Sequence, residues 1–210
     1  MKKYKPLKMI NKGRYRQCYA TLNKTQQQQV LGRMEQLISE NRQWCDRGNY
    51  GHLCNILPTL AIDAVLQASG HSPDQSLSIL SHHMWAALKP EGMQRLAQRS
   101  FFMPLMKVVV PLGFNLKSGR GWNYVWHKDT DPSNQFHFEC TECLYKHIFD
   151  HYGVTHRFGP MFCHSDIINY GALPHTDFIR TQTLCQGGQL CDFCFVRHQP
   201  GEEWNRTPSI

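Results

Sequence analysis

The sequence has no long hydrophobic run. Its most apolar stretch, residues 101–114, is shorter than the roughly 20 residues that span a bilayer and contains Lys107. The first 20 residues have neither a continuous apolar segment nor a small-residue cleavage site, so we expect no secretory signal. No internal repeat is evident. These absences favour a soluble protein, and 210 residues are enough to bury a core.

Acidic residues are absent from residues 1–24, which carry eight of the 23 Lys and Arg. The remaining fifteen basic residues nearly balance the 16 acidic ones, so the formal charge of +7 belongs to a basic N-terminal arm rather than to the whole surface. Such an arm is either a solvated tail or a contact for an anionic surface, lipid or nucleic acid.

The cysteines lack the pattern of a disulfide framework. There are nine, an odd number, and they are scattered through a chain much larger than a disulfide miniprotein. We therefore expect free thiols and a cytoplasmic location.

The first half of the chain is predicted to be helical. Ser72 and Pro73 have the residue types of a helix N-cap and first helical position. Apolar spacing predicts helices within residues 23–48, over 57–69, over 73–89, and from Glu91 into 101–114, where Pro104 should kink or end the helix.

The second half changes to strand patterns. Strands are predicted over residues 122–128 and 135–140, helices over 142–153 (after Thr141 as N-cap) and 160–171 (from Pro160), and a hairpin at Gly187-Gly188. The prediction is an α+β fold: a helical N-terminal half packed on an antiparallel sheet with two inserted helices and a C-terminal β-hairpin. The expected organisation is an arm (1–24), a single domain (25–200) and a tail (201–210).

Two Cys-x-x-Cys motifs suggest zinc, but strand geometry argues against a pair of zinc knuckles. Residues three apart on a strand point to opposite faces, so Cys191 and Cys194 cannot bind one ion. Cys140 ends a strand, whereas Cys143 starts the next helix, so this pair does not form a knuckle either.

His137 is predicted to point outward, because it lies between the inward-facing Phe136 and Phe138, and we expect it to be exposed to solvent.

The same alternation of strand faces predicts a different group of neighbouring side chains. Cys140 and Cys191 should point inward from the sheet, while Cys163 and Asp166 share one face of a helix. These four residues could bind a metal such as zinc, Cys163 could act as a nucleophile, or the cysteines could simply pack in the core.

The C-terminal part resembles the L-2-amino-thiazoline-4-carboxylic acid hydrolase family, best over residues 120–198. The motifs that carry the resemblance are Cys140 before a helix, Cys163 with Asp166, Arg180 with Thr181 and Thr183, the Gly187-Gly188 turn, and Cys191-Asp192-Phe193. Cys143, Cys185, Cys194 and the basic arm depart from that pattern.

The resemblance implies a reaction. Water adds to the amidine-like carbon of a 2-aminothiazoline, and the ring opens with release of a thiol to give an N-carbamoyl cysteine. Cys163 would be the nucleophile or a ligand of a water-activating metal, and Asp166 a proton-transfer group or ligand. Arg180 would bind the substrate carboxylate, with Thr181 and Thr183 as further substrate-binding residues, unless Arg180 forms a structural pair with Asp192 or Asp177.

Two alternatives remain open. The layout is also similar to small-molecule-binding domains of the 4-vinyl-reductase type, some of which carry zinc, which favours a non-catalytic ligand-binding or metal-sensing domain. Otherwise the chain is an interaction protein whose basic arm contacts a membrane or nucleic acid.

Overall fold

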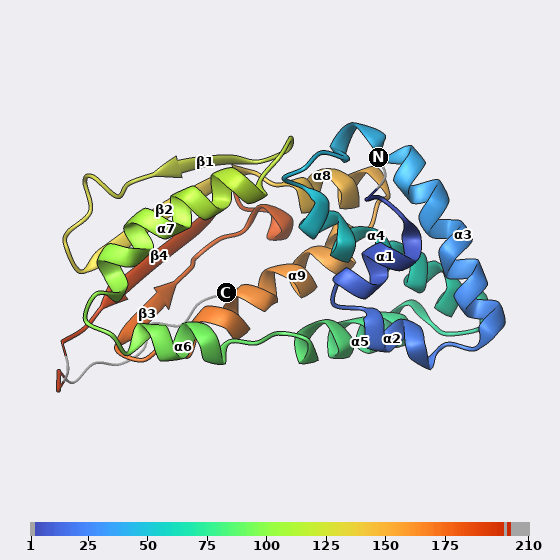
Figure 1. The fold of residues 1–210 in the computed structure, drawn as a ribbon, viewed down its shortest axis with the longest axis horizontal. Coiled ribbons are helices and arrows are strands. Elements are labelled where there is room, and N and C mark those ends of the chain that lie inside the picture. The colour runs from blue at the N-terminus through green and yellow to red at the C-terminus, as the bar shows by residue number, and fades with distance from the viewer. Residues whose placement is uncertain (1–2, 200, 203–210) are drawn as a thin grey trace. The chain divides into compact units, whose positions relative to one another are not determined.

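The computed structural model describes residues 3–199, 201 and 202 (Figure 1). The chain divides into two compact units. The first comprises the described residues up to Leu88 together with Lys117–Arg120, and the second comprises Lys89–Leu116 and the described residues from Gly121 onward. Among the described residues no helix combines the length and the apolar character needed to cross a bilayer.

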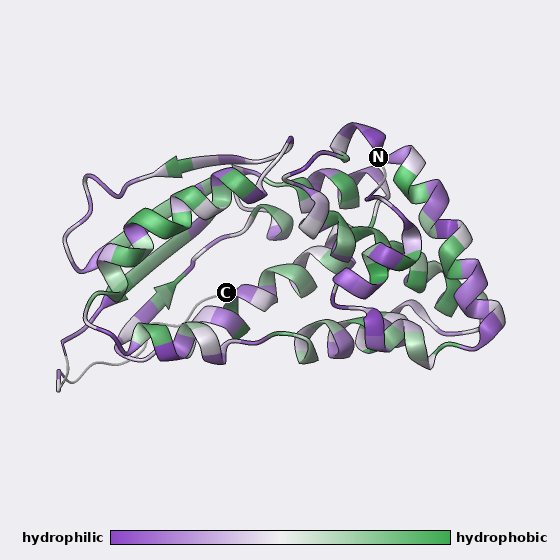
Figure 2. Ribbon diagram, in the orientation of Figure 1, coloured by the Kyte–Doolittle hydropathy of each residue, from purple (hydrophilic) through white to green (hydrophobic). Residues whose placement is uncertain are grey.

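The first unit is entirely helical. Capping boxes begin two of its helices, at Asn23 with Gln26 and at Ser72 with Gln75, so the predicted start at Ser72 and Pro73 is confirmed. Its elements are α1 (Pro6–Lys12), α2 (Arg16–Thr21), α3 (Lys24–Glu40), the 3₁₀ helix η1 (Arg42–Trp44), α4 (Tyr50–Ala68) and α5 (Pro73–Ala86). Figure 2 shows α4 rich in hydrophobic residues, and α4 forms the centre of this unit because it packs against α1, α3 and α5.

The N-terminal segment differs from a solvated tail. Residues 6–21 contain two short helices, and Met9, Ile10, Tyr15 and Cys18 are buried in the first unit. The hydroxyls of Tyr15 and Thr59 are 2.9 Å apart, which ties the segment to α4. The apolar residues between the lysines supply enough burial to order it. Contact with an anionic surface stays a prediction.

The second unit contains a four-stranded antiparallel sheet in the order β1-β2-β4-β3. The strands are β1 (Asn123–Trp126), β2 (Gln135–Glu142), β3 (Thr176–Ile179) and β4 (Cys191–Arg197). β3 and β4 form the predicted C-terminal hairpin, but eleven residues, 180–190, connect them. Gly187 has φ +90° and closes the 3₁₀ helix η2 (Leu184–Gln186), so the glycine pair is not a two-residue turn.

Helices pack on one face of this sheet: α6 (Glu91–Ala97), α7 (Phe102–Lys117) and α9 (Thr155–Tyr170). The helix α8 (Leu144–His151) packs against α9 and the 3₁₀ helix η2. The core that joins sheet and helices consists of Ala97, Phe102, Met103, Met106, Phe136, Phe138, Leu173, Phe178 and Phe195. The α+β fold is therefore confirmed, with α6 and α7 supplying the helical part that packs on the sheet.

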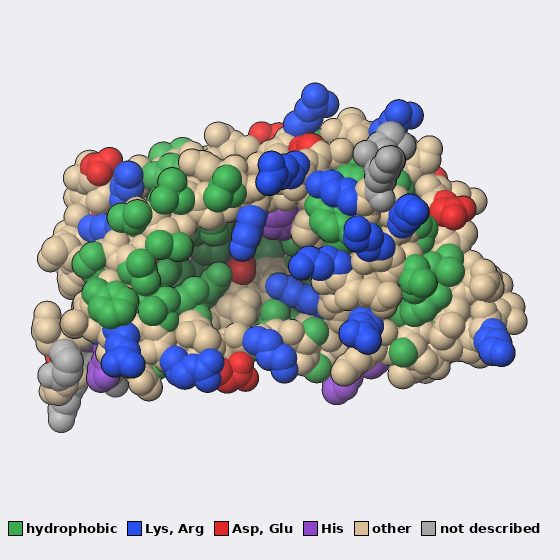
Figure 3. Space-filling model, viewed as in Figure 1, with side chains coloured by type: hydrophobic (Ala, Val, Ile, Leu, Met, Phe, Trp, Pro, Cys, Tyr) green, Lys and Arg blue, Asp and Glu red, His purple; other side chains and the backbone are tan. Residues whose placement is uncertain are grey.

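The helix α7 is apolar on its outer side as well. It exposes Val108, Val109, Leu112 and Leu116, and Figure 3 shows hydrophobic side chains gathered over this part of the molecule. Pro104 lies in the first turn of α7, where a proline is tolerated because the backbone N–H has no helical partner.

Two predicted boundaries are wrong. Thr141 lies in β2, so α8 begins after Cys143 instead. Pro160 lies inside α9, which starts five residues earlier at Thr155. The division into residues 1–24, 25–200 and 201–210 stays a prediction, and residues 203–210 of the expected tail lie outside the described residues.

Candidate functional site

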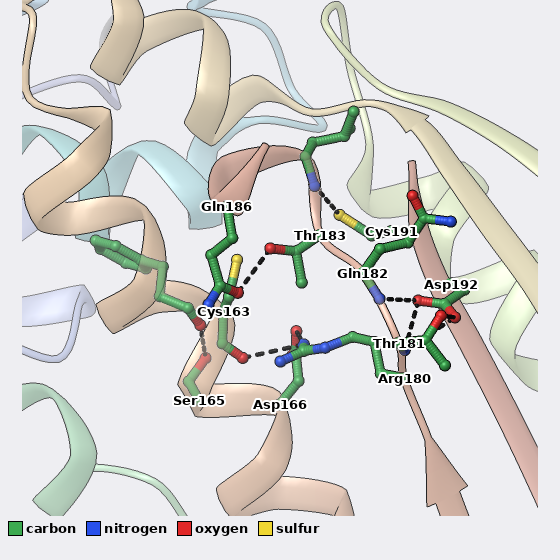
Figure 4. Close-up of polar contacts among 12 residues, drawn as sticks. Cys163, Ser165, Asp166, Arg180, Thr181, Gln182, Thr183, Gln186, Cys191 and Asp192 are labelled. Atoms are coloured by element: carbon green, nitrogen blue, oxygen red, sulfur yellow. Dashed lines mark hydrogen bonds and ion pairs between the residues drawn. The ribbon is translucent and has the colours of Figure 1, made fainter. Parts of the chain in front are cut away.

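A buried arginine organises one side of the predicted site. Arg180 follows β3, and its side chain is 1% exposed. Its Nη1 donates to the carbonyl oxygen of Cys163 at 3.1 Å and to Oδ2 of Asp166 at 3.0 Å (Figure 4). Cys163 and Asp166 therefore lie on one face of α9, as their spacing predicts, and the guanidinium ties this face to the end of β3.

The thiol of Cys163 lies among polar partners. The pKa of Cys163 is lowered, mainly because the Cys185 thiol donates a hydrogen bond to its sulfur. Burial acts in the opposite direction, whereas the Thr183 hydroxyl and the positive charge of Arg180 lower the pKa further. This surrounding favours the thiolate, which is the nucleophilic form of cysteine.

Close packing of η2 against α9 brings Cys185 to Cys163. A Cβ atom placed on Gly159 would lie 2.6 Å from Cβ of Cys185, a distance that real side chains do not tolerate. Only glycine at this position of α9 allows the approach. Cys185 is 7% exposed, and its pKa is raised because it shares hydrogen bonds with Cys143 and Cys163.

A second pair of thiols lies across the sheet. Cys140 on β2 is directly opposite Cys191 on β4, and both are buried at 3% and 7% exposure, as predicted from strand parity. The pKa of Cys191 is lowered, first by its interaction with the Cys140 side chain, and its sulfur also accepts from the Leu184 N–H at 3.3 Å, while the Cys140 thiol donates to the Glu142 carbonyl oxygen at 3.0 Å. Cys140 is accordingly the protonated partner, with its pKa raised.

Five cysteines thus form a thiol cluster: Cys140, Cys143, Cys163, Cys185 and Cys191. Cys143 and Cys185 were expected only to pack or to depart from the family pattern. The stacked rings of Trp122 and Tyr124, 5.9 Å apart, pack beside the Cys140–Cys191 pair. Sequence spacing gives little sign of this cluster, because its members come from β2, the start of α8, α9, η2 and β4.

The loop after β3 separates the two predicted threonines. The Oγ1 of Thr181 donates to Oδ2 of Asp192 at 2.7 Å, and the backbone N–H groups of Thr181 and Gln182 also donate to this carboxylate (Figure 4). Thr183 is 1% exposed and lies beside Cys163, while its hydroxyl donates to Oε1 of Gln186 at 2.8 Å. Thr183 therefore lies beside Cys163, whereas Thr181 binds the Asp192 carboxylate.

Arg180 and Thr183 both reach Cys163, although a regular hairpin would place Arg180 on the opposite face from Thr183 and Cys191. The reason is that β3 ends at Ile179, so the alternation of faces stops before Arg180. The expected structural partners of Arg180 were Asp192 or Asp177, but the ion pair at 3.0 Å joins it to Asp166.

The four predicted zinc ligands, Cys140, Cys163, Cys191 and Asp166, are not arranged to bind a single ion together. Cys140 lies opposite Cys191 and Cys163 lies beside Cys185, while Asp166 is held by Arg180. Within the described part of the chain, a different group has the spacing of metal ligands. It is made by His127, His137 and Glu139, whose ligand atoms all lie within 4.8 Å of one another.

The chain matches a family model over residues 65–195, which is more than half of its length. The model describes L-2-amino-thiazoline-4-carboxylic acid hydrolase, and the matched range includes all five members of the thiol cluster together with Asp166 and Arg180. No curated protein and no solved structure matches the chain.

Proposed function

We propose that this protein opens a small cyclic amidine-like substrate by hydrolysis. The premise is that the chain belongs to the L-2-amino-thiazoline-4-carboxylic acid hydrolase family. The observation that carries the proposal is the placement of Cys163, whose thiol receives a hydrogen bond from Cys185 and lies beside Thr183 above the Arg180–Asp166 pair. A thiolate next to a thiol donor and a carboxylate is suited to nucleophilic catalysis.

In the first step, the Cys163 thiolate attacks the carbon between the ring sulfur and the ring nitrogen. The bond from this carbon to the ring sulfur breaks, and the departing sulfur takes the proton of Cys185. The product of this step is an isothiourea in which Cys163 holds the opened substrate. Cys185 supplies the proton because its raised pKa keeps it protonated until a stronger base forms beside it.

In the second step, water attacks the same carbon and Asp166 accepts one of its protons, which then restores Cys185. The side chain of Asp166 is 31% exposed, so solvent reaches its carboxylate. The bond to Cys163 breaks, the water oxygen becomes the carbonyl oxygen of a urea, and the second water proton goes to the former ring nitrogen. The net reaction consumes one water and yields an N-carbamoyl amino thiol.

Arg180 acts in this scheme as a positioning residue rather than a direct ligand of the substrate. Its guanidinium is buried and holds both the Cys163 backbone and the Asp166 carboxylate. Thr183, which lies beside the Cys163 sulfur, is the better of the two threonines for contacting a bound substrate.

The test is turnover of L-2-amino-2-thiazoline-4-carboxylate, measured as formation of the N-carbamoyl thiol by mass spectrometry. We expect Cys163→Ala to lower kcat/KM by at least about 10³-fold, because the nucleophile is lost. Cys194→Ser is the matched control, since Cys194 lies on the opposite sheet face from Cys191 and should retain activity. Acid quenching during turnover should trap a peptide containing Cys163 with the added mass of the substrate.

Equal activity of the Cys163→Ala variant and the control would exclude the proposed nucleophile. Saturable binding of the thiazoline without any product, in the unmodified protein, would instead support the non-catalytic ligand-binding alternative.

A further inference from the structure

A second group of ligating side chains lies on the other face of the sheet. His127 directly follows β1, and His137 and Glu139 lie on β2. Trp126 and Phe138 are paired across these strands and pack towards the helices, so the residues next to them point away from the core. Glu139 is adjacent to Cys140 in sequence, but the two side chains are on opposite faces, and this group is therefore separate from the thiol cluster.

The three side chains have the separation of metal ligands. One ligand atom from each of His127, His137 and Glu139 lies within 4.8 Å of the other two. Nε2 of His127 is 3.4 Å from Oε1 of Glu139. Two ligands bound to zinc at about 2.1 Å and at the tetrahedral angle are also about 3.4 Å apart. The ligand atom of His137 lies within 4.8 Å of the other two, so side-chain rotation would bring it into the same coordination shell.

Within the part of the chain that the structure describes, the Nε2 atom of His127 is buried without a normal hydrogen bond, which is uncommon for a residue that only packs. The imidazole rings of His127 and His137 are stacked, with centroids 4.4 Å apart and planes at 12°. The atom within reach of the His127 Nε2 is Oε1 of Glu139 at 3.4 Å, and a cation bound between the two would satisfy a buried polar nitrogen that otherwise costs free energy.

The backbone around the group is fixed before any ligand binds. The carbonyl oxygen of His127 accepts from the N–H groups of Thr130 and Asp131, and its own N–H donates to the His137 carbonyl oxygen at 3.1 Å. Oδ2 of Asp131 in turn accepts from the His137 N–H at 2.6 Å. The turn between β1 and β2 thus holds both histidines, so little conformational entropy is lost on metal binding.

We propose that His127, His137 and Glu139 form a binding site for a divalent transition metal ion, with Zn²⁺ as the ion that fits the ligand set best. Two imidazole nitrogens and one carboxylate suit zinc, and three protein ligands leave a fourth position for water or another small ligand. Cys194 lies opposite His137 on β4. The site is independent of the proposed hydrolase chemistry at Cys163.

The experiment is calorimetric titration of the metal-free, full-length protein with Zn²⁺. We expect His137→Ala and Glu139→Gln each to weaken binding of one equivalent by at least about 10-fold, since changes outside the ligand shell alone cost that much. His156→Ala is the matched control, because His156 is exposed on α9. Glu139→Gln keeps the size of the side chain, so it separates ligand loss from unfolding, and Zn²⁺ should raise the Tm of the control by more than that of this variant.

Substitution with Co²⁺ distinguishes this site from the thiol cluster. Ligation by His127, His137 and Glu139 predicts a bound Co²⁺ with visible d–d absorption and no thiolate-to-metal charge-transfer band. Metal binding that has the same affinity and stoichiometry in His137→Ala and Glu139→Gln as in the control, or that occurs only through thiolate, would overturn the proposal.

Discussion

Replacing Cys185 with alanine should make Cys163 less reactive at neutral pH. The Cys185 thiol donates a hydrogen bond to the Cys163 sulfur, and this bond is the largest cause of the lowered Cys163 pKa. Alanine removes the donor but keeps the Cβ atom that packs against Gly159. The change therefore tests the hydrogen bond without opening the contact between η2 and α9.

The magnitude follows from the strength of a hydrogen bond to a charged group, about 1.5–3 kcal/mol. Because a thiol is a weak donor, we take the lower limit. A loss of about 1.5 kcal/mol reduces the thiolate fraction below the pKa by about 10-fold. The rising limb of Cys163 reactivity should consequently move to higher pH in Cys185→Ala. Cys185→Ser keeps an O–H donor at the same place and should remain close to the unmodified protein.

The assay is the rate of alkylation by iodoacetamide between pH 5 and 10, followed on the peptide that contains Cys163 by mass spectrometry. Peptide resolution is needed because four other thiols lie in the cluster. A Cys163 rate that is unchanged or faster in Cys185→Ala would refute the reasoning. An equal loss in the serine variant would show that the size of residue 185, rather than its hydrogen bond, controls Cys163.

Two further predictions concern stability. Arg180→Met should lower the free energy of unfolding, measured in urea, by about 3 kcal/mol. This is the lower limit for breaking a buried ion pair, and it applies because Asp166 retains some contact with water. A loss below about 1 kcal/mol would show that the ion pair contributes little to stability. Gly159→Ala should cost about 1–3 kcal/mol, since the added methyl group would lie 2.6 Å from Cβ of Cys185. Gly113→Ala in α7, which meets nothing within 4 Å, should be neutral or slightly stabilising, and equal costs in the two glycine variants would contradict the packing argument.

Strand parity was the most productive argument from sequence. It placed Cys191 and Cys194 on opposite faces and Cys140 on the same face as Cys191, and the register confirms both placements. Period-two alternation is a local property of the backbone, so it can be read from a single strand. The helix start at Ser72 was equally predictable, because a capping box is contained within four consecutive residues.

The same local arguments did not identify the partners of Cys163. Cys185 was assigned to packing because it lies outside the strand, and its approach depends on a glycine 26 residues earlier in the sequence, at position 159 of α9. His137 was expected to be a solvent-exposed side chain on β2, yet it stacks on His127, which directly follows β1. Each of these contacts joins residues from different elements.

The sequence by itself determined the helical first half, the α+β class, the inward and outward faces of the strands and the family resemblance, because these depend on local spacing and on short motifs. Only the tertiary structure decided that Arg180 pairs with Asp166, that five thiols including Cys163 and Cys191 form one cluster, and that two histidines and a glutamate meet on the outer face of the sheet. These contacts depend on strand register, on the end of β3 before Arg180 and on the packing of η2 against α9, which long-range burial fixes and local spacing does not encode.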